Sequence, residues 1–267
     1  MYNHGAKFLC VPCDEDGMLV DRLPALIEGA RSEGKTVKFI YTIATFQNPC
    51  GATMSLERRK ALVRIAREYG VAIFEDDPYG YVRFDGEHLP TLFSLDGGEH
   101  VIYAGSFSKI LAPGTRVGWC CGDRNLIRKM AVFKQGVDTC TSVVAQALVY
   151  QYATLGHLDA FLPKIIAHYR TKRDVMMESF AEYLPAGEAR FTKPEGGFFF
   201  WLETPNIPVD ALFDHAIARN VAVVKGVPFY PNGDGGDHHC RVCFTFASAD
   251  AIREGVKRLG DAMRELL

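Results

Sequence analysis

The sequence has no long apolar run, no block of like charge and no repeat, and each absence excludes a class of protein. The longest apolar runs, Val37 to Ile43 and Phe198 to Leu202, are far too short to span a membrane. Met1 to Asp14 lacks the cationic and apolar regions of a secretory signal, so we expect a cytoplasmic location. Lysine and arginine (30) nearly balance aspartate and glutamate (32), so we expect neither a nucleic-acid nor a membrane partner.

The composition is that of an ordinary globular protein. Of the 267 residues, 48% are hydrophobic and 23% are charged, which is enough for one large domain or two of ordinary size, each with its own core. The eight cysteines are scattered through the chain without a pattern. In a chain of this length they are typical of reduced core residues, and a disulfide framework is not expected.

Strands and helices alternate in the first half of the sequence. Val37 to Ile43, Val71 to Phe74 and Val101 to Ala104 are short apolar runs, and the first of them predicts a strand that is buried on both faces. Between the first two runs, apolar residues recur at helical spacing from a Ser55 cap to Gly70. This order predicts an α/β fold with a mostly parallel sheet.

The second half of the sequence predicts a smaller α+β domain. After a fourth strand at Val117 to Cys121, the pattern is helical from Arg124 to Leu184, with a break or new start expected at Pro163. We expect a large domain at 1–157 and a small domain at 158–267. The further elements expected are strands at 197–202, 221–224 and 241–247, a helix at 210–219, and a closing helix after Ser248.

Polar segments follow three of the predicted strands, at the sheet edge where parallel sheets bind ligands. They are Gln47 to Gly51, Glu75 to Tyr79 and Gly105 to Lys109. Each segment alone is also typical of a simple turn or helix cap. Lys109, with Arg116 seven residues later, suggests an amine that forms a Schiff base beside an anion site, although a solvated surface lysine is the alternative.

Four strings carry a resemblance to a known family: YTIATFQNPCGATMS, FEDDPYGYV, YAGSFSKILAPGTRVGW and CRVCFTFAS. The chain resembles the fold-type I, pyridoxal-phosphate (PLP) dependent aminotransferases of class I/II. It is most similar to the branch with 2-aminoadipate and kynurenine aminotransferases and the aminotransferase-like domains of MocR regulators. The resemblance implies an aspartate aminotransferase-like fold, transfer of an amino group between an L-amino acid and a 2-oxo acid, and a homodimer.

The resemblance also implies a role for each cofactor-binding residue. Lys109 would hold PLP covalently and move the proton, and it would be the catalytic residue. Asp76 would accept a hydrogen bond from the pyridine nitrogen, with Glu75 and Asp77 facing away from it. The remaining cofactor contacts would come from Asn48 and Tyr79 to the phenolic oxygen, and from Ser106, Ser108 and Arg116 to the phosphate.

For the substrate, the resemblance implies that Arg241, together with Asn48, binds the α-carboxylate. A surface strand arginine is the alternative, but Arg241 interrupts an otherwise apolar run. The peptide bond before Pro49 is expected to be cis. The Phe229 to Pro231 loop, which follows Lys225-Gly226 where relatives commonly have Pro-Gly, is expected to border the substrate pocket.

In the family, a glycine-rich phosphate loop and a ring-stacking aromatic residue precede any segment that matches Met1 to Asp16. We therefore expect that about the N-terminal third of the family fold is not in this chain, and that the chain alone binds PLP weakly or not at all.

Three other interpretations remain open. The first is a zinc site from Cys10, Cys13, Cys240 and Cys243 with His238 and His239, although an offset of three places the last two cysteines on opposite faces of a strand. The second is the effector domain of a MocR-type transcriptional regulator. The third is another PLP reaction, such as β-elimination or decarboxylation, which the same residues would serve.

Overall fold

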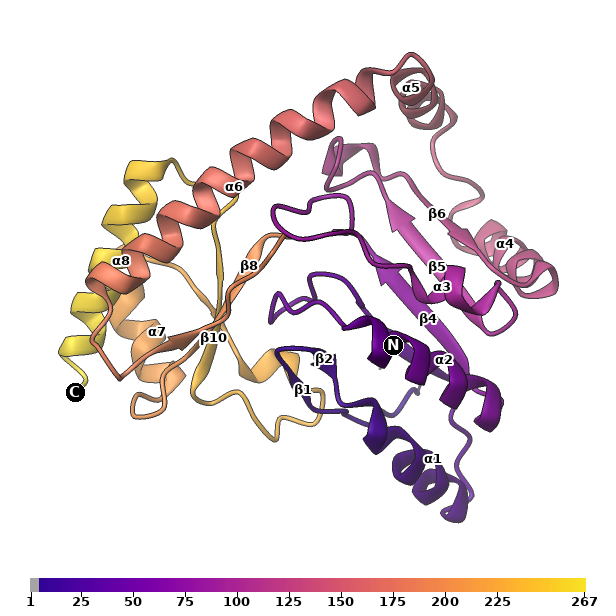
Figure 1. The fold of residues 1–267 in the computed structure, drawn as a ribbon, viewed down its shortest axis with the longest axis horizontal. Coiled ribbons are helices and arrows are strands. Elements are labelled where there is room, and N and C mark those ends of the chain that lie inside the picture. The colour runs from indigo at the N-terminus through magenta and orange to yellow at the C-terminus, as the bar shows by residue number, and fades with distance from the viewer. Residues whose placement is uncertain (1–4) are drawn as a thin grey trace. The chain divides into compact units, whose positions relative to one another are not determined.

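The computed structural model describes residues 5–267, and the chain divides into two compact units, whose helices and strands are drawn in Figure 1. The mixed-sheet unit consists of Val11–Gln47 and Ala52–Ile166. Among the described residues, the antiparallel-sheet unit consists of 5–10, Asn48–Gly51 and Ala167–Leu267. The division into a large domain at 1–157 and a small domain at 158–267 stays a prediction.

The mixed-sheet unit contains a four-stranded sheet in the order β3-β4-β5-β6. β3 (Phe39–Thr42), β4 (Ala72–Asp77) and β5 (Val101–Ser106) are parallel, and β6 (Gly118–Cys121) is antiparallel to β5. The expected α/β fold with a mostly parallel sheet is therefore confirmed. Because β4 and β5 run in the same direction, with Asp76 opposite Ala104, the segments that follow them leave the sheet at one edge.

One face of this sheet carries the core of the unit. Helix α2 (Leu56–Tyr69) begins after Ser55 and ends at Gly70, which has a φ of 60°, and both boundaries agree with the sequence prediction. α2 and α1 (Leu23–Ser32) pack their apolar residues against Ile40 and Ile73 of the sheet. The other elements of this region are β1 (Cys13–Asp14), β2 (Gly17–Met18), the 3₁₀ turn η2 (Val20–Arg22) and α3 (Leu92–Asp96).

The prediction that the first strand is buried on both faces is wrong. Along β3, Ile40 and Thr42 are buried, whereas Phe39 and Tyr41 are 41% and 43% exposed. Successive side chains of a strand point to opposite faces, and the core lies only on the Ile40 face. An unbroken apolar run therefore does not guarantee that both faces of a strand are covered.

The helical region contains α4 (Arg124–Asp138), α5 (Val143–Thr154) and α6 (His157–Tyr183). The break expected at Pro163 is wrong, because α6 continues through this residue. Pro163 is near the start of the helix and removes one hydrogen bond, the one to the carbonyl of Asp159, which does not end a helix of 27 residues. Among the described helices, none combines the length and apolar character needed to cross a membrane.

The antiparallel-sheet unit has the order β7-β8-β10-β9. Phe200 and Leu202 point to the buried face of this sheet, where Phe244 also packs. The closing helix α8 (Ala249–Arg264) is capped by the Ser248 hydroxyl, which accepts from the Ala251 N–H. The expected α+β arrangement is confirmed. Its other elements are β7 (Arg190–Phe191), β8 (Phe199–Glu203), α7 (Val209–Ala218), β9 (Val224–Lys225), the 3₁₀ turn η4 (Val227–Phe229) and β10 (His239–Cys243).

The start of β5 is fixed by a buried carboxylate. Asp96 accepts hydrogen bonds from the backbone N–H groups of His100 (2.6 Å) and Val101 (3.0 Å) and from Arg67 (3.1 Å). Burial by itself raises the pKa of Asp96, but the hydrogen bonds from these donors lower it by more. The pKa of Asp96 therefore lies below its ordinary value of 3.8. The carboxylate therefore stabilises the strand that leads to Lys109.

Replacing Asp96 by asparagine should lower the free energy of unfolding at pH 7 by about 1.5–3 kcal/mol, because bonds to a charged acceptor are lost. The pKa of Asp96 is lower in the folded chain, so its contribution is complete above 3.8 and disappears as the pH falls through the folded value. Urea unfolding at pH 7 and pH 3 should show the difference from the wild type shrink. Asp138→Asn, at an exposed carboxylate, is the control. A difference that does not change with pH would contradict this account.

Candidate active site

Two of the three consecutive carboxyl groups at the end of β4 accept hydrogen bonds from neighbouring parts of the fold. Glu75 accepts hydrogen bonds from the backbone N–H groups of Leu92 and Phe93, both at 2.9 Å, and so caps the start of α3. Asp77 accepts from the Gly80 N–H and the Tyr103 hydroxyl, both at 2.9 Å. Burial raises the pKa of both groups above their ordinary values, although these donors act in the opposite direction.

Asp76 points to the other face of the sheet. Its Oδ2 accepts a hydrogen bond of 2.7 Å from the hydroxyl of Tyr41 on β3, and the Tyr41 ring stacks on Phe74. Burial and the Asp76 carboxylate raise the pKa of Tyr41, and Tyr79 is close enough to add to the effect. The expectation that Glu75 and Asp77 face away from Asp76 is confirmed. Tyr41 was missed, because its position on the Asp76 face depends on the exact start of β3.

Lys109 lies in a turn directly after β5. The turn is closed by hydrogen bonds from the Leu111 N–H to the Phe107 carbonyl and from the Phe107 N–H to the Val117 carbonyl. Lys109 is half-buried, and within residues 5–267 its ε-amine has no hydrogen-bond or ion-pair partner. An amine held beside a strand end without a counter-charge is chemically available to a ligand.

The neighbours of Lys109 include several groups that suit an anion. The Ser108 N–H donates to the Ser106 Oγ at 3.1 Å, which leaves the hydrogen of the Ser106 hydroxyl free to be donated. Arg116 follows the 3₁₀ turn η3 (Pro113–Thr115), is exposed, and has a φ of 53°. A left-handed backbone is uncommon for a residue other than glycine and is often found at functional sites.

In the other unit, Asn48 and Arg241 are directly bonded. Arg241 Nη1 donates to Asn48 Oδ1 at 2.7 Å, although 193 residues separate the two in the sequence. The Asn48–Pro49 peptide bond is cis, as expected. Arg241 also has its guanidinium carbon 4.1 Å from the ring centre of Phe199 and 5.2 Å from that of Phe229. The aromatic partners of Arg241 were not identified from the sequence.

A buried arginine holds the two ends of the loop that carries Asn48. Arg59 is 0% exposed, and each of its three nitrogens donates a hydrogen bond. Its acceptors include the carbonyls of Ala44 and Met54, and the Met54 N–H also donates a hydrogen bond of 2.8 Å to the Ala44 carbonyl. Arg59 therefore closes the base of the 44–54 loop, a role that its place in an ordinary helix did not indicate.

The eight predicted site residues thus form two groups. Asp76, Tyr79, Ser106, Ser108, Lys109 and Arg116 belong to the mixed-sheet unit, at or beyond the ends of β4 and β5. Asn48 and Arg241 belong to the antiparallel-sheet unit.

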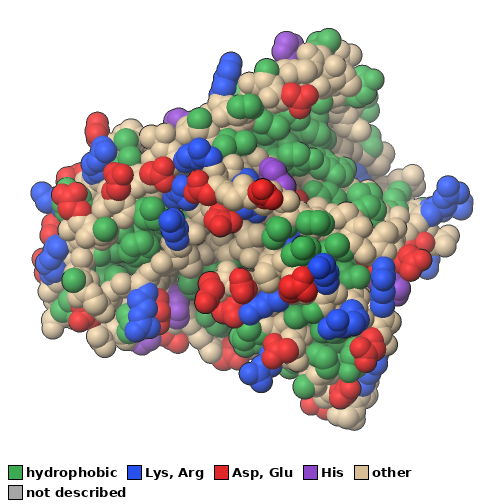
Figure 2. Space-filling model, in the orientation of Figure 1, with side chains coloured by type: hydrophobic (Ala, Val, Ile, Leu, Met, Phe, Trp, Pro, Cys, Tyr) green, Lys and Arg blue, Asp and Glu red, His purple; other side chains and the backbone are tan. Residues whose placement is uncertain are grey.

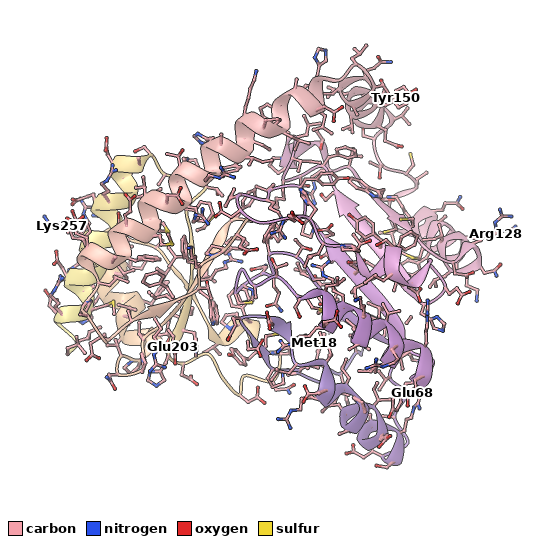
Figure 3. The ribbon with its side chains drawn as sticks, in the orientation of Figure 1. Met18, Glu68, Arg128, Tyr150, Glu203 and Lys257 are labelled. Atoms are coloured by element: carbon pink, nitrogen blue, oxygen red, sulfur yellow. The ribbon has the colours of Figure 1, made fainter. Side chains whose placement is uncertain are left out.

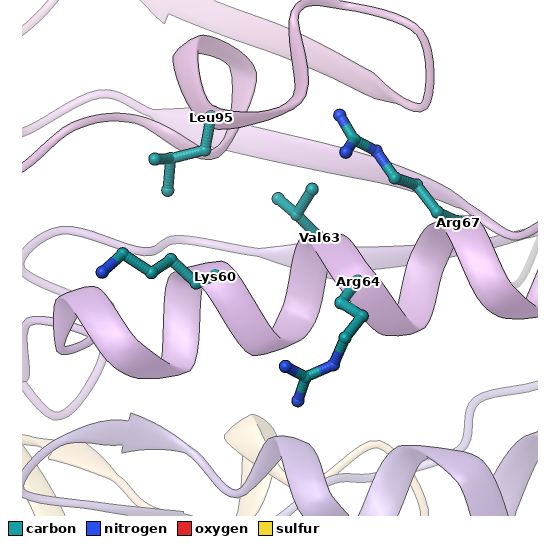
Figure 4. Close-up of a pocket in the computed structure, with 5 residues that line it drawn as sticks. All are labelled: Lys60, Val63, Arg64, Arg67 and Leu95. Atoms are coloured by element: carbon teal, nitrogen blue, oxygen red, sulfur yellow. The ribbon is translucent and has the colours of Figure 1, made fainter.

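A pocket of about 230 Å³ lies elsewhere, beside α2 and α3, and contains none of these residues (Figure 4). Its cations are Lys60, Arg64 and Arg67. Lys60 is paired with Glu57 and Arg67 with Asp96, so only Arg64 lacks a carboxylate partner among the described residues. We assign no ligand to this pocket.

The proposed zinc ligands do not form a cluster. Cys240 is buried and Cys243 is exposed, because they lie on opposite faces of β10 as expected for a strand. In the part of the chain that the structure describes, no three His, Cys, Asp or Glu side chains are grouped to hold a metal.

The family model described as "Aminotransferase class I and II" matches residues 3–259. The chain belongs to this family. It is 42% identical over 260 residues to aromatic-amino-acid aminotransferase 1 of Thermococcus litoralis (97% of this chain, 62% of the relative). It is 37% identical over 267 residues to 2-aminoadipate transaminase of Thermus thermophilus (98% of this chain, 65% of the relative).

A solved member of the family has the same fold. The structure of Pyrococcus horikoshii kynurenine aminotransferase, in complex with PMP and with KYN and KYA as substrates and products, superposes with a TM-score of 0.94 and 42% identity. The match covers 98% of this chain and 64% of that structure. The chain therefore spans just under two thirds of the length of these relatives.

Glu75 and Asp76 of β4 should respond differently to substitution. Glu75→Leu should lower the free energy of unfolding by about 1–3 kcal/mol, because the buried Leu92 N–H and the part-buried Phe93 N–H lose their acceptor. Asp76→Leu is the matched control and should change it by less than about 1 kcal/mol, since the hydroxyl of the half-exposed Tyr41 can bond to water. Urea unfolding measures both, and equal losses would show that Asp76 is also structural.

Proposed function

We propose that this chain carries the PLP site and the α-carboxylate site of an aminotransferase that moves an amino group between an L-amino acid and a 2-oxo acid. The observation that carries the proposal is the arrangement of side chains at the carboxyl ends of β4 and β5. There Asp76 faces away from Glu75 and Asp77, which are hydrogen-bonded within the fold. The amine of Lys109, which has no partner among the described residues, follows the neighbouring strand β5.

The residues present fit this cofactor. Lys109 supplies an amine that can attach an aldehyde covalently and afterwards hold or deliver a proton. Asp76 uses Oδ2 for Tyr41, and its other oxygen can accept a hydrogen bond from a protonated ring nitrogen. Tyr79, which is 6% exposed, and Asn48 are the proposed donors to the phenolic oxygen. When bound, PLP supplies an electron-withdrawing ring that stabilises charge at the substrate's α-carbon.

We assign the phosphate to Ser106, Ser108 and Arg116. The hydroxyl groups can donate to phosphate oxygens, and the guanidinium of Arg116 can donate further hydrogen bonds to them. Donors from other parts of the family fold are expected to strengthen this site, so we expect the affinity of the 267-residue chain for PLP to be weak.

The substrate's α-carboxylate is assigned to Arg241 and Asn48. A guanidinium binds a carboxylate through two parallel hydrogen bonds, and the amide NH₂ of Asn48 can add a third. A site that binds the α-carboxylate suits reactions that keep this group, and so favours amino transfer over decarboxylation.

We also propose that the enzyme is a homodimer, as the family resemblance implies. Figure 2 shows hydrophobic side chains gathered over the region of α5, where Figure 3 labels Tyr150. Contiguous apolar surface of this kind marks protein contacts, and a second copy is the partner that we propose. The large hydrophobic residues of α4, α5 and their flanks that are more than half exposed are Val132, Phe133, Val137, Val143, Val144, Leu148, Tyr150 and Leu155.

A titration with PLP tests the cofactor site. The visible absorbance of the covalent lysine adduct should develop in the wild-type chain at a large excess of PLP and should be absent in Lys109→Ala. The control is Lys129→Ala, which removes an exposed lysine of α4 and should behave as the wild type. If Lys109→Ala keeps the adduct band, the proposed site is wrong.

A further inference from the structure

The guanidinium of Arg241 contacts an asparagine and two aromatic rings, but one of its N–H groups has no hydrogen-bond acceptor among the described residues. Nη1 donates to Asn48, and the rings of Phe199 and Phe229 lie against the guanidinium. Its Nε is buried and has no hydrogen-bond partner in the described part of the chain. A buried N–H that is left unpaired is costly, so its availability points to a ligand.

Gly51 brings the Asn48 segment into contact with β8. Its φ is 72°, and a Cβ at this position would lie 2.9 Å from the Phe199 carbonyl oxygen and 3.1 Å from Pro194 Cβ. These neighbours cannot move easily, because the Pro194 carbonyl accepts a hydrogen bond of 2.6 Å from the buried Arg173. Only glycine fits at Gly51 without moving the segment away from β8.

Phe199 connects the two halves of this arrangement. Its ring lies against the guanidinium of Arg241, and its carbonyl oxygen occupies the space that a Cβ at Gly51 would need. Gly51 is three residues from Asn48, the hydrogen-bond acceptor of Arg241. One residue of β8 therefore fixes both members of the Asn48–Arg241 pair.

We propose that Gly51 and Phe199 are positioning residues that hold Asn48 and Arg241 in the geometry needed to bind the substrate's α-carboxylate. The inference rests on the proposed function, in which Arg241 binds that carboxylate. Fixing the guanidinium before the substrate arrives lowers the entropy that binding costs, and it keeps Nε–H directed at the carboxylate. Gly51 and Phe199 themselves donate no hydrogen bond to the substrate.

The test compares two glycines. Gly51→Ala and Gly187→Ala both place alanine at a left-handed φ, but Gly187 has open space around its Cβ position. The dissociation constant for pyruvate is measured in the 267-residue chain with excess PLP by isothermal titration calorimetry, a readout that applies equally to every variant below. We expect it to rise about tenfold in Gly51→Ala, corresponding to about 1.4 kcal/mol, and less than twofold in Gly187→Ala.

A second pair of variants covers the case in which Gly51→Ala does not fold. Phe199→Leu removes the ring but keeps the carbonyl, whereas Phe199→Tyr keeps both. We expect weaker pyruvate binding in the first variant and near-normal binding in the second. A merely structural role would instead lower stability without separating pyruvate affinity between these two variants.

The outcomes distinguish the two proposals. If Arg241→Lys abolishes pyruvate binding while Gly51→Ala and Phe199→Leu retain wild-type affinity, the positioning proposal is overturned and the proposed carboxylate site stands. If pyruvate does not bind the wild-type chain, or binds Arg241→Lys equally well, the carboxylate site itself is overturned.

Discussion

A carboxylate buried in a protein needs hydrogen-bond donors, and this requirement organises the end of β4. Glu75 obtains its donors from the start of α3, and Asp77 obtains them from Tyr103 and the following turn. These bonds fix α3 and the turn against one face of the sheet. Because side chains alternate along a strand, Asp76 is left on the opposite face, where the Tyr41 hydroxyl is its one side-chain hydrogen-bond donor among residues 5–267.

The same reasoning distinguishes Arg59 from Arg241. All three nitrogens of Arg59 donate to groups of the protein, which marks a residue that holds the 44–54 loop together. Arg241 has a buried Nε without a partner among residues 5–267, although rings and an asparagine surround it. A cation whose hydrogen bonds are complete supports the fold, and one whose bonds are incomplete is a candidate for ligand binding.

The sequence was sufficient for features that depend on neighbouring residues. The boundaries of α2 follow from Ser55 and Gly70, and the opposite faces of Asp76 and Glu75 follow from alternation within one strand. The family resemblance, and not periodicity, supplied the roles of Lys109 and Arg241, and these roles remain proposals. Contacts that join distant segments were not predictable: Tyr41 with Asp76, and Gly51 with Phe199, depend on strand register and on close packing. The exposure of Phe39 and the continuation of α6 through Pro163 also depend on tertiary packing.

The central claim is that the edge formed by β4 and β5 binds PLP through Lys109. Its most direct test is to reduce the mixture of chain and PLP with borohydride and to map the modified peptides by mass spectrometry. The account predicts that the label is concentrated on Lys109 even at partial saturation. A label distributed over exposed lysines, with no preference for Lys109, would contradict it.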